Sequence, residues 1–123
     1  MELRPWYTEA YNILGGGFVL QGRLDQAVVQ YRKALLDPEN SASRIDLGLT
    51  LARQGNSAEA IIQLRQAILR DRQNPDAHRV LAAIFVNLGR LREAAAEFAE
   101  VLRLRPDHAE ARAFLAMARS RRM

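Results

Sequence analysis

Histidines and carboxylates are the residue types in this sequence with the widest catalytic repertoire, but their spacing does not assemble a reactive site. His78 and His108 are 30 residues apart, whereas two zinc-binding histidines on one helix are separated by about four residues. The sequence has no cysteine, which excludes disulfides and thiolate metal ligands. We therefore expect no catalytic residue, no metal site and no cofactor, and we interpret both histidines as surface or boundary residues.

Two further patterns resemble chemical motifs and have simpler explanations. Glu93, Glu97 and Glu100 stand near arginines at helical spacing, which is typical of a solvated helix face. Gly15-Gly16-Gly17 falls inside a helical pattern and no lysine follows it, so it does not form a phosphate-binding loop. Gly16 either allows a neighbouring helix to approach closely or lets the backbone of a ligand lie on its own helix.

The elements that must position any binding residues come from a repeat of 33 to 34 residues. A leucine, a glycine and an alanine each recur at this period. The nine residues are Leu14, Leu47, Leu81, Gly22, Gly55, Gly89, Ala27, Ala60 and Ala94. A fixed period between 20 and 50 residues indicates stacked structural repeats. Apolar residues recur at helical spacing on both sides of each glycine, so each unit is predicted to be a helical hairpin.

Helix boundaries follow from the residues that start and stop helices. We predict helices over about 24–36, 41–54 and 57–70, with Asn56 or Ser57 capping the third of these. Pro75 is placed to open the next helix, and Pro5 to open the first. The last segment ends early, and Arg119 takes the position of Phe18, Leu51 and Phe85. A charge there is expected for a terminal helix with one exposed side.

These residues resemble the tetratricopeptide repeat family, whose pattern of aromatic, Leu, Gly, Ala and Pro positions each unit meets in part. The first unit has Tyr11, Leu14, Gly15, Phe18, Ala27, Tyr31 and Pro38. Arg44 and His78 occupy the tryptophan position of the second and third units, and Arg72 stands where a proline belongs. The resemblance implies an all-α fold, an α-solenoid (right-handed superhelix) of three helical hairpins plus a C-terminal capping helix. It also implies one domain over residues 1–123, comprising an extension (1–7), three repeats (8–40, 41–74 and 75–108) and the cap (109–123).

In proteins similar to this one, the first helices of successive repeats line a concave groove that takes a peptide. The resemblance therefore implies a groove lined by Asn12, Gly16, Val19, Leu20, Ile45, Leu49, Arg53, Asp76, Arg79, Ala83, Val86 and Asn87. Ile45, Leu49 and Val86 are expected to be exposed and to make its centre apolar. A subgroup of the family grips chaperone C-termini through lysine and asparagine. Asp46 and Asp76 stand at such positions here, which disfavours that ligand.

The function implied is a non-catalytic scaffold that binds a peptide or helix segment of another protein. One alternative is self-association, in which a second copy or an arm containing Leu3 and Trp6 fills the groove. Another is a regulatory subunit or domain of a larger enzyme or transport assembly. Trp6 either covers the first helical pair or anchors a partner, since tryptophan is enriched at binding hot spots.

Composition sets the remaining bounds. The net charge of +4 lies entirely in residues 101–123, because basic and acidic side chains balance over residues 1–100. No basic stripe with interleaved aromatic residues runs along the repeats, which argues against nucleic-acid binding. The longest apolar run, residues 13–20, is too short to span a membrane. We expect a cytoplasmic protein, with the periplasm left open. Lys33 is the only lysine, and this preference for arginine favours a GC-rich bacterial genome.

Overall fold

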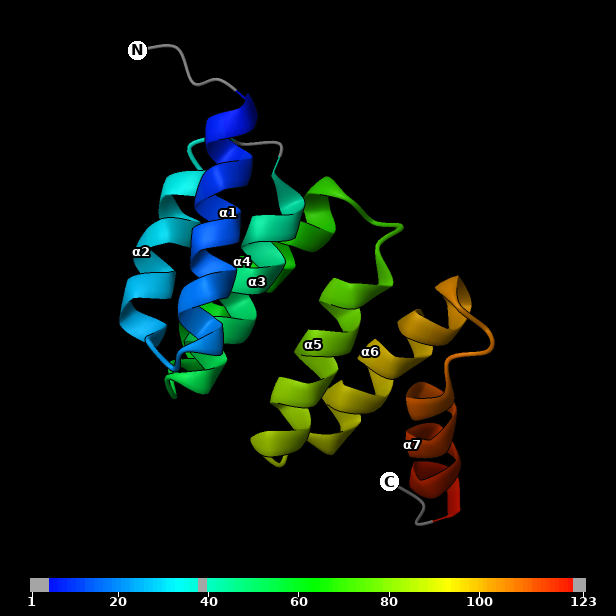
Figure 1. Ribbon diagram of the computed structural model, residues 1–123. Coiled ribbons are helices and arrows are strands. Elements are labelled where there is room, and N and C mark those ends of the chain that lie inside the picture. The colour runs from blue at the N-terminus through cyan, green and yellow to red at the C-terminus, as the bar shows by residue number, and fades with distance from the viewer. Residues whose placement is uncertain (1–4, 38–39, 121–123) are drawn as a thin grey trace. The chain divides into compact units, whose positions relative to one another are not determined.

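The computed structural model describes residues 5–37 and 40–120, which form seven α-helices and no strand (Figure 1). The helices are α1 (Pro5–Leu20), α2 (Leu24–Ala34), α3 (Ser41–Arg53), α4 (Ser57–Arg70), α5 (Pro75–Asn87), α6 (Leu91–Leu104) and α7 (Ala109–Ser120). The expectations for Leu3, the side chain of Trp6, the Pro38 turn and the C-terminal Arg121 and Arg122 lie outside what is described.

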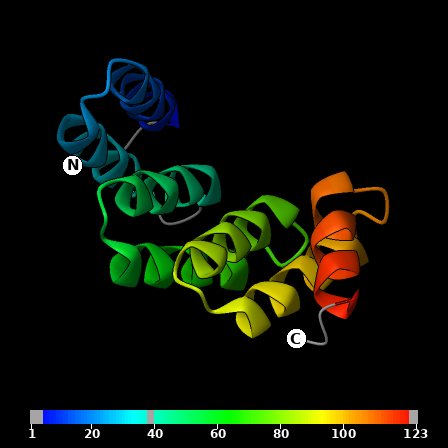
Figure 2. The same cartoon turned by 90° about the horizontal axis from the view of Figure 1, so that it is seen from below.

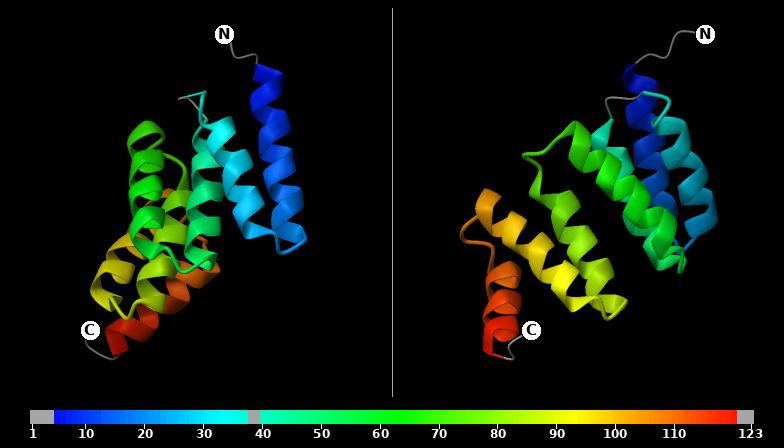
Figure 3. Two further views of the ribbon diagram at one scale, coloured as in Figure 1. Left: turned by 90° about the vertical axis from the view of Figure 1, so that its left-hand side faces the viewer. Right: turned by 180° about the vertical axis from the view of Figure 1, so that it is seen from behind.

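The helices belong to two compact units, Met1–Arg70 and Asp71–Met123. Unit 1 contains the hairpins α1–α2 and α3–α4, and α2 also packs against α3. Unit 2 contains the hairpin α5–α6, with α7 packed on α6. Within each hairpin the two helices run side by side in opposite directions, as the further views also show (Figures 2 and 3). The predicted helical hairpins are therefore confirmed.

Each hairpin turns at a glycine with a left-handed backbone conformation. Gly22, Gly55 and Gly89 have φ angles of 75°, 86° and 74°. The residue after each glycine donates its backbone N–H to a carbonyl in the last turn of the preceding helix, as Arg23 does to Phe18 at 2.9 Å. This is the pattern that closes a helix C-terminus, and glycine adopts it without a steric penalty from Cβ. The recurrent glycine therefore sets where each first helix ends.

Helices α4 and α5 each begin after an asparagine whose side chain accepts a hydrogen bond from a backbone N–H in the first turn. The Asn74 side chain accepts a hydrogen bond from the backbone N–H of Asp76 at 2.9 Å, and Pro75 opens α5 as predicted. Asn56 accepts from the backbone N–H of Glu59 at 3.4 Å, and α4 spans the range expected for it. Helix α2 ends at Ala34, two residues before the predicted end, because Leu36 bonds in a tighter turn to the carbonyl of Lys33.

The helices of each hairpin meet where a small residue on the first faces a large residue on the second. The three pairs are Gly15 with Tyr31, Gly48 with Leu64, and Ala82 with Phe98. A Cβ atom added to Gly15 would lie 2.6 Å from Cε1 of Tyr31, and one added to Gly48 would lie 2.8 Å from Cγ of Leu64. The buried Ala27, Ala60 and Ala94 provide the same close approach from the second helices.

The core of unit 2 is an aromatic and aliphatic cluster that joins all three of its helices. Ala82, Phe98, Val101 and Ala111 are buried together, and Phe114 of α7 packs against them. The ring centroids of Phe98 and Phe114 are 4.8 Å apart. Arg119 is exposed on α7, as expected at a terminal helix. No helix of the described residues is long and apolar enough to cross a membrane.

His78 does not lie on the surface, which corrects the interpretation made from the sequence. Its side chain is buried between α5 and α6, and the whole residue is 8% exposed. Its Nδ1 lies 2.9 Å from Oε1 of Glu97, which is therefore part of a buried pair and not of a solvated face. The sequence pattern missed this pair because it depends on residues 19 positions apart meeting across the hairpin.

Replacing Glu97 with alanine is expected to lower the free energy of unfolding by about 1–3 kcal/mol, because the buried His78 imidazole loses its partner. Glu93→Ala serves as the matched control, since Glu93 pairs with Arg90 on the exposed surface of the same helix. That change is expected to cost less than about 0.5 kcal/mol. Urea unfolding at neutral pH measures the free energy of unfolding of both variants. Equal losses of stability would contradict a specific role for the His78–Glu97 pair.

Candidate functional site

The first part of the candidate groove lies on one face of α1 in unit 1. Gly16 follows Asn12 by four residues, and Val19 and Leu20 follow Gly16 by three and four residues. Residues three and four positions apart are neighbours on a helix surface. Val19 is half-buried, and Leu20 is 90% exposed. The tight contact with Tyr31 is made by Gly15, whereas a Cβ at Gly16 would approach no atom closer than 3.9 Å. Close helix packing therefore explains Gly15, and contact between Gly16 and a ligand stays a prediction.

The second part comes from α3, where the expectation for Ile45 was wrong. Ile45 is only 8% exposed. Helix α3 packs against α2 on one side and α4 on the other, so it has less free surface than α1. Leu49 is half-buried and Arg53 is exposed, one and two turns further along the same face. Ile45 thus belongs to the core, and Leu49 and Arg53 are the α3 residues that a ligand would reach.

A side-chain hydrogen bond joins α1 directly to α3. Asn12 donates from its Nδ2 to the Oγ of Ser43 at a distance of 2.6 Å. Ser43 is fully buried, so Asn12 is held at one end of the groove and is not free to rotate. The hydrogen bond therefore ties α1 to α3 within unit 1, and both helices carry candidate residues.

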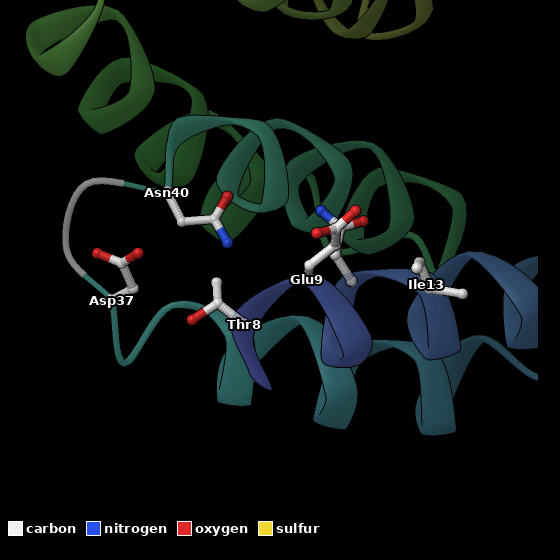
Figure 4. A pocket seen from close by; sticks show the side chains of 6 residues that line it. Thr8, Glu9, Ile13, Asp37 and Asn40 are labelled. Atoms are coloured by element: carbon white, nitrogen blue, oxygen red, sulfur yellow. The ribbon is translucent and has the colours of Figure 1, made fainter. Parts of the chain in front are cut away.

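Next to Asn12 lies a hollow of about 490 Å³ between α1 and the residues that precede α3 (Figure 4). The hollow is lined by Thr8, Glu9, Asn12, Ile13, Asp37 and Asn40. Thr8 is 6% exposed, and its Oγ1 has no hydrogen-bond partner among the described residues. An unsatisfied buried hydroxyl is costly, so a polar group of a ligand that reached it would be stabilised there. Glu9 and Asp37 give the same hollow a negative character.

Sequence reasoning missed Thr8, Asp37 and Asn40 as candidate site residues. A signal existed for Asn40, because asparagine directly before a helical pattern indicates an N-cap. Its Oδ1 accepts from the backbone N–H of Ser43 at 3.0 Å. Thr8 carried no such signal, since its burial depends on how α1 packs against its neighbours.

Tyr31 links the core of unit 1 to the charges of the α3 face. Burial raises the pKa of the Tyr31 phenol, nearby Asp46 raises it further, and Arg53 acts in the opposite direction. Because the folded pKa is raised, its contribution to stability is present below the unfolded pKa and is lost as the pH rises through the folded pKa. Tyr31 is therefore neutral at physiological pH and acts as a packing residue for Gly15.

The predicted groove residues of the third repeat lie on α5 in unit 2, which is a compact unit of its own. The residues are Asp76, Arg79, Ala83, Val86 and Asn87, which repeat at helical spacing. Ala83 and Asn87 are exposed, and Val86 is 38% exposed, as expected for an apolar contact. Arg79 Nε lies 3.9 Å from Oδ1 of Asp76, an exposed pair within one turn. Such a pair contributes little to stability, so both side chains remain able to contact a ligand.

No reactive constellation appears among the residues that the structure describes. Groups of three or more histidine, aspartate or glutamate side chains that could hold a metal ion are absent from residues 5–37 and 40–120. His108 is used structurally, because its Nδ1 accepts from the backbone N–H of Ala111 at 3.2 Å at the start of α7. What this surface offers is apolar contact, hydrogen bonds and charge.

Comparison with solved structures gives close matches over most of the chain. A first TPR of Spaghetti (RPAP3), bound to the HSP90 peptide SRMEEVD, is 23% identical with a TM-score of 0.88, and the match covers 98% of this chain and 96% of that chain. The second TPR domain of human RPAP3, in complex with an HSP70 peptide, is 24% identical with a TM-score of 0.85 and coverages of 94% and 98%. The Arabidopsis OM64 TPR domain is 22% identical with a TM-score of 0.87 and coverages of 95% and 98%.

At the level of sequence, no curated protein matches this chain significantly. Two family models described as tetratricopeptide repeat do match it, one over residues 18–84 and the other over residues 79–121. Together they span the three glycine turns, two of the three small-to-large packing pairs and the helix α7 described above. This chain belongs to the tetratricopeptide repeat family, and its fold is an all-α solenoid of helical hairpins.

Proposed function

We propose that this protein is a non-catalytic scaffold that binds a peptide or helix segment of another protein along α1 and α3 of unit 1. The observation that carries the proposal is the surface of unit 1. There, α1 and α3 carry the partly or largely exposed apolar Val19, Leu20 and Leu49, and the N-terminal part of α1 borders a polar hollow. The buried Thr8 hydroxyl in that hollow has no hydrogen-bond partner among the described residues. Two solved TPR structures with this fold hold peptides, which supports the same mode of binding here.

The chemistry of the surface favours an apolar segment over an acidic tail. The peptide in one neighbouring structure, SRMEEVD, contains two consecutive glutamates. In this chain Glu9 and Asp37 line the hollow, and Asp46 and Asp76 stand at positions where a carboxylate-binding member would carry lysine or asparagine. Like charges in one site repel, so an acidic terminus would bind this surface poorly. Leu20 and Leu49 instead suit apolar side chains spaced along a helix or strand.

Leu49→Arg is expected to abolish capture of the partner while leaving the fold intact. Leu49 is half-buried at the centre of the α1 and α3 surface, and a cation there would disrupt an apolar contact. The measurement is pull-down with the purified chain, followed by mass spectrometry and by direct titration of the partner identified. At least a tenfold rise in Kd, on the order of 1.4 kcal/mol, is expected.

Ile62→Arg is the control for that experiment. Ile62 is 54% exposed on α4, away from the α1 and α3 surface, so it introduces the same charge without touching the groove. A partner list that Leu49→Arg leaves unchanged, or that Ile62→Arg changes equally, would refute the groove as the binding site. Circular dichroism of both variants shows whether the helices remain intact.

Self-association is the second candidate, and α1 supplies the observation that favours it. Ile13, Leu14 and Leu20 are 66%, 49% and 90% exposed on a helix with no charged residue after Glu9. A second copy would cover this apolar surface. Sedimentation at two protein concentrations separates the two functions, since a strict monomer removes self-association. The cytoplasmic location inferred from the sequence stays a prediction.

A further inference from the structure

One arginine of unit 1 is held by neutral side chains where the next repeat uses a carboxylate. The repeat of 34 residues aligns three positions of α3 and α4 with three of α5 and α6: Arg44 with His78, Gln63 with Glu97, and Gln66 with Glu100. In unit 2, His78 contacts the carboxylate of Glu97 at 2.9 Å. At the same positions of unit 1, a permanent cation faces two amides.

Within residues 5–37 and 40–120, the contacts of Arg44 provide no counterion for its charge. Its Nη1 donates to Oε1 of Gln63 at 2.9 Å and to Oε1 of Gln66 at 2.7 Å. Its Nε is buried and has no hydrogen-bond partner among the described residues. Burial lowers the pKa of Arg44, and the nearby cation of Arg70 lowers it further. Arg44 as a whole is half-buried, and the amides satisfy its donors without offsetting its charge.

The same arginine lines a hollow formed by side chains of α3 and of the C-terminal part of α4. The hollow has a volume of about 350 Å³ and is lined by Arg44, Gln66, Leu69 and Arg70. Because Oε1 of Gln66 accepts from Arg44, the amide N–H groups of Gln66 are directed away from the guanidinium and remain donors. The side chains of Arg44, Arg70 and Gln66 thus bring two positive charges and an amide to the lining of the hollow. Leu69, which is 66% exposed, adds an apolar wall.

We propose that this hollow binds the carboxylate of an acidic side chain in a peptide segment of a partner protein. Arg44 and Arg70 supply the charge, Gln66 supplies a further hydrogen bond, and Leu69 contacts an apolar neighbour of the acidic residue. The contribution of Leu69 distinguishes a peptide from a free phosphate, which has no apolar group to place there. The site lies between α3 and α4 and does not depend on the groove proposed above.

The test is a nuclear magnetic resonance titration of the full chain that follows the arginine Nε–Hε signals. The probe is the acetylated and amidated tetrapeptide Leu-Glu-Glu-Leu, with Leu-Gln-Gln-Leu as the neutral control and inorganic phosphate as a third ligand. The acidic peptide is expected to shift the signals of Arg44 and Arg70. The neutral peptide is expected not to shift them, and phosphate is expected to bind about tenfold more weakly than the acidic peptide.

The most informative variant is Gln66→Glu, which installs the carboxylate that Glu100 provides in the next repeat. The new carboxylate would act as an internal counterion in the site. This variant is therefore expected to weaken binding of the acidic peptide about tenfold or more while keeping the protein folded. Arg70→Gln is expected to weaken binding by a similar factor. Arg103→Gln is the control, because it removes the same charge from α6 of unit 2, outside the lining of the hollow, and it is expected to leave peptide binding unchanged.

Three results would overturn the proposal. The first is equal binding of the acidic and neutral peptides, and the second is unchanged binding in both Gln66→Glu and Arg70→Gln. The third is phosphate binding as tightly as the acidic peptide with the same dependence on these variants, which would indicate a site for small anions. Arg44→Gln is also informative, but the decision rests on the other two variants because Arg44 is packed between two helices.

Discussion

Replacing Phe98 with alanine is expected to lower the free energy of unfolding by about 3–5 kcal/mol, the loss typical of a fully buried phenylalanine. Phe98 is 3% exposed and lies in the cluster that joins α5, α6 and α7. Its ring packs against Phe114 and fills the space beside Ala82. Removal would leave a cavity at the point where all three helices of unit 2 meet. Urea unfolding followed by circular dichroism measures the effect.

Two variants separate cavity formation from other effects of that substitution. Phe98→Leu retains most of the volume and is expected to cost less than about 1.5 kcal/mol. Val29→Ala truncates a half-exposed residue of α2 and is expected to change stability by less than about 0.5 kcal/mol. A cost for Phe98→Ala no larger than that for Val29→Ala would mean that Phe98 does not support the core of unit 2.

The second large effect is expected at the three consecutive glycines of α1, where identical substitutions should have opposite signs. Gly15→Gln is expected to lower the free energy of unfolding by about 3 kcal/mol, because the new side chain must displace the Tyr31 ring and bury an amide. A Cβ there would already lie 2.6 Å from the ring. Gly17→Gln is expected to raise the free energy of unfolding by about 0.5 kcal/mol. A Cβ added at Gly17 would meet no atom within 4 Å, and glutamine is the better helix former.

A double-mutant cycle identifies the contact responsible. In the Tyr31→Ala background the space beside Gly15 is empty, so Gly15→Gln is expected to lose most of its additional cost. Thermal unfolding of the four proteins gives the coupling energy. A penalty that persists undiminished without the Tyr31 ring would show that the constraint at Gly15 lies elsewhere.

The repeat explains why so much of the local structure was predictable. Helix starts depend on adjacent residues, as with Asn74 and Pro75, and hairpin turns depend on one glycine each. These are short-range effects, so sequence spacing alone indicates them. The end of α2 was placed two residues too late because Leu35 and Leu36 continue the apolar pattern after the hydrogen bonding has changed.

The candidate site was less predictable because exposure depends on neighbouring helices. Ile45 and Leu49 are both apolar and one turn apart, and the sequence does not distinguish them. Only the packing of α3 between α2 and α4 buries Ile45 and leaves Leu49 partly accessible. The same holds for Thr8, which is buried in a structure where α1 packs against α2.

The sequence by itself determined the family, the helical hairpins, the glycine turns and the small residues at which helices meet, since each of these is encoded by residue types at a fixed period. The tertiary structure decided which polar residues are buried and with what partner. Glu97 and Gln63 occupy equivalent positions, and only the meeting of two helices reveals that one brings a carboxylate to His78 while the other brings a neutral amide to Arg44. Contacts between residues about 20 positions apart arise from the folded geometry, and no local pattern specifies them.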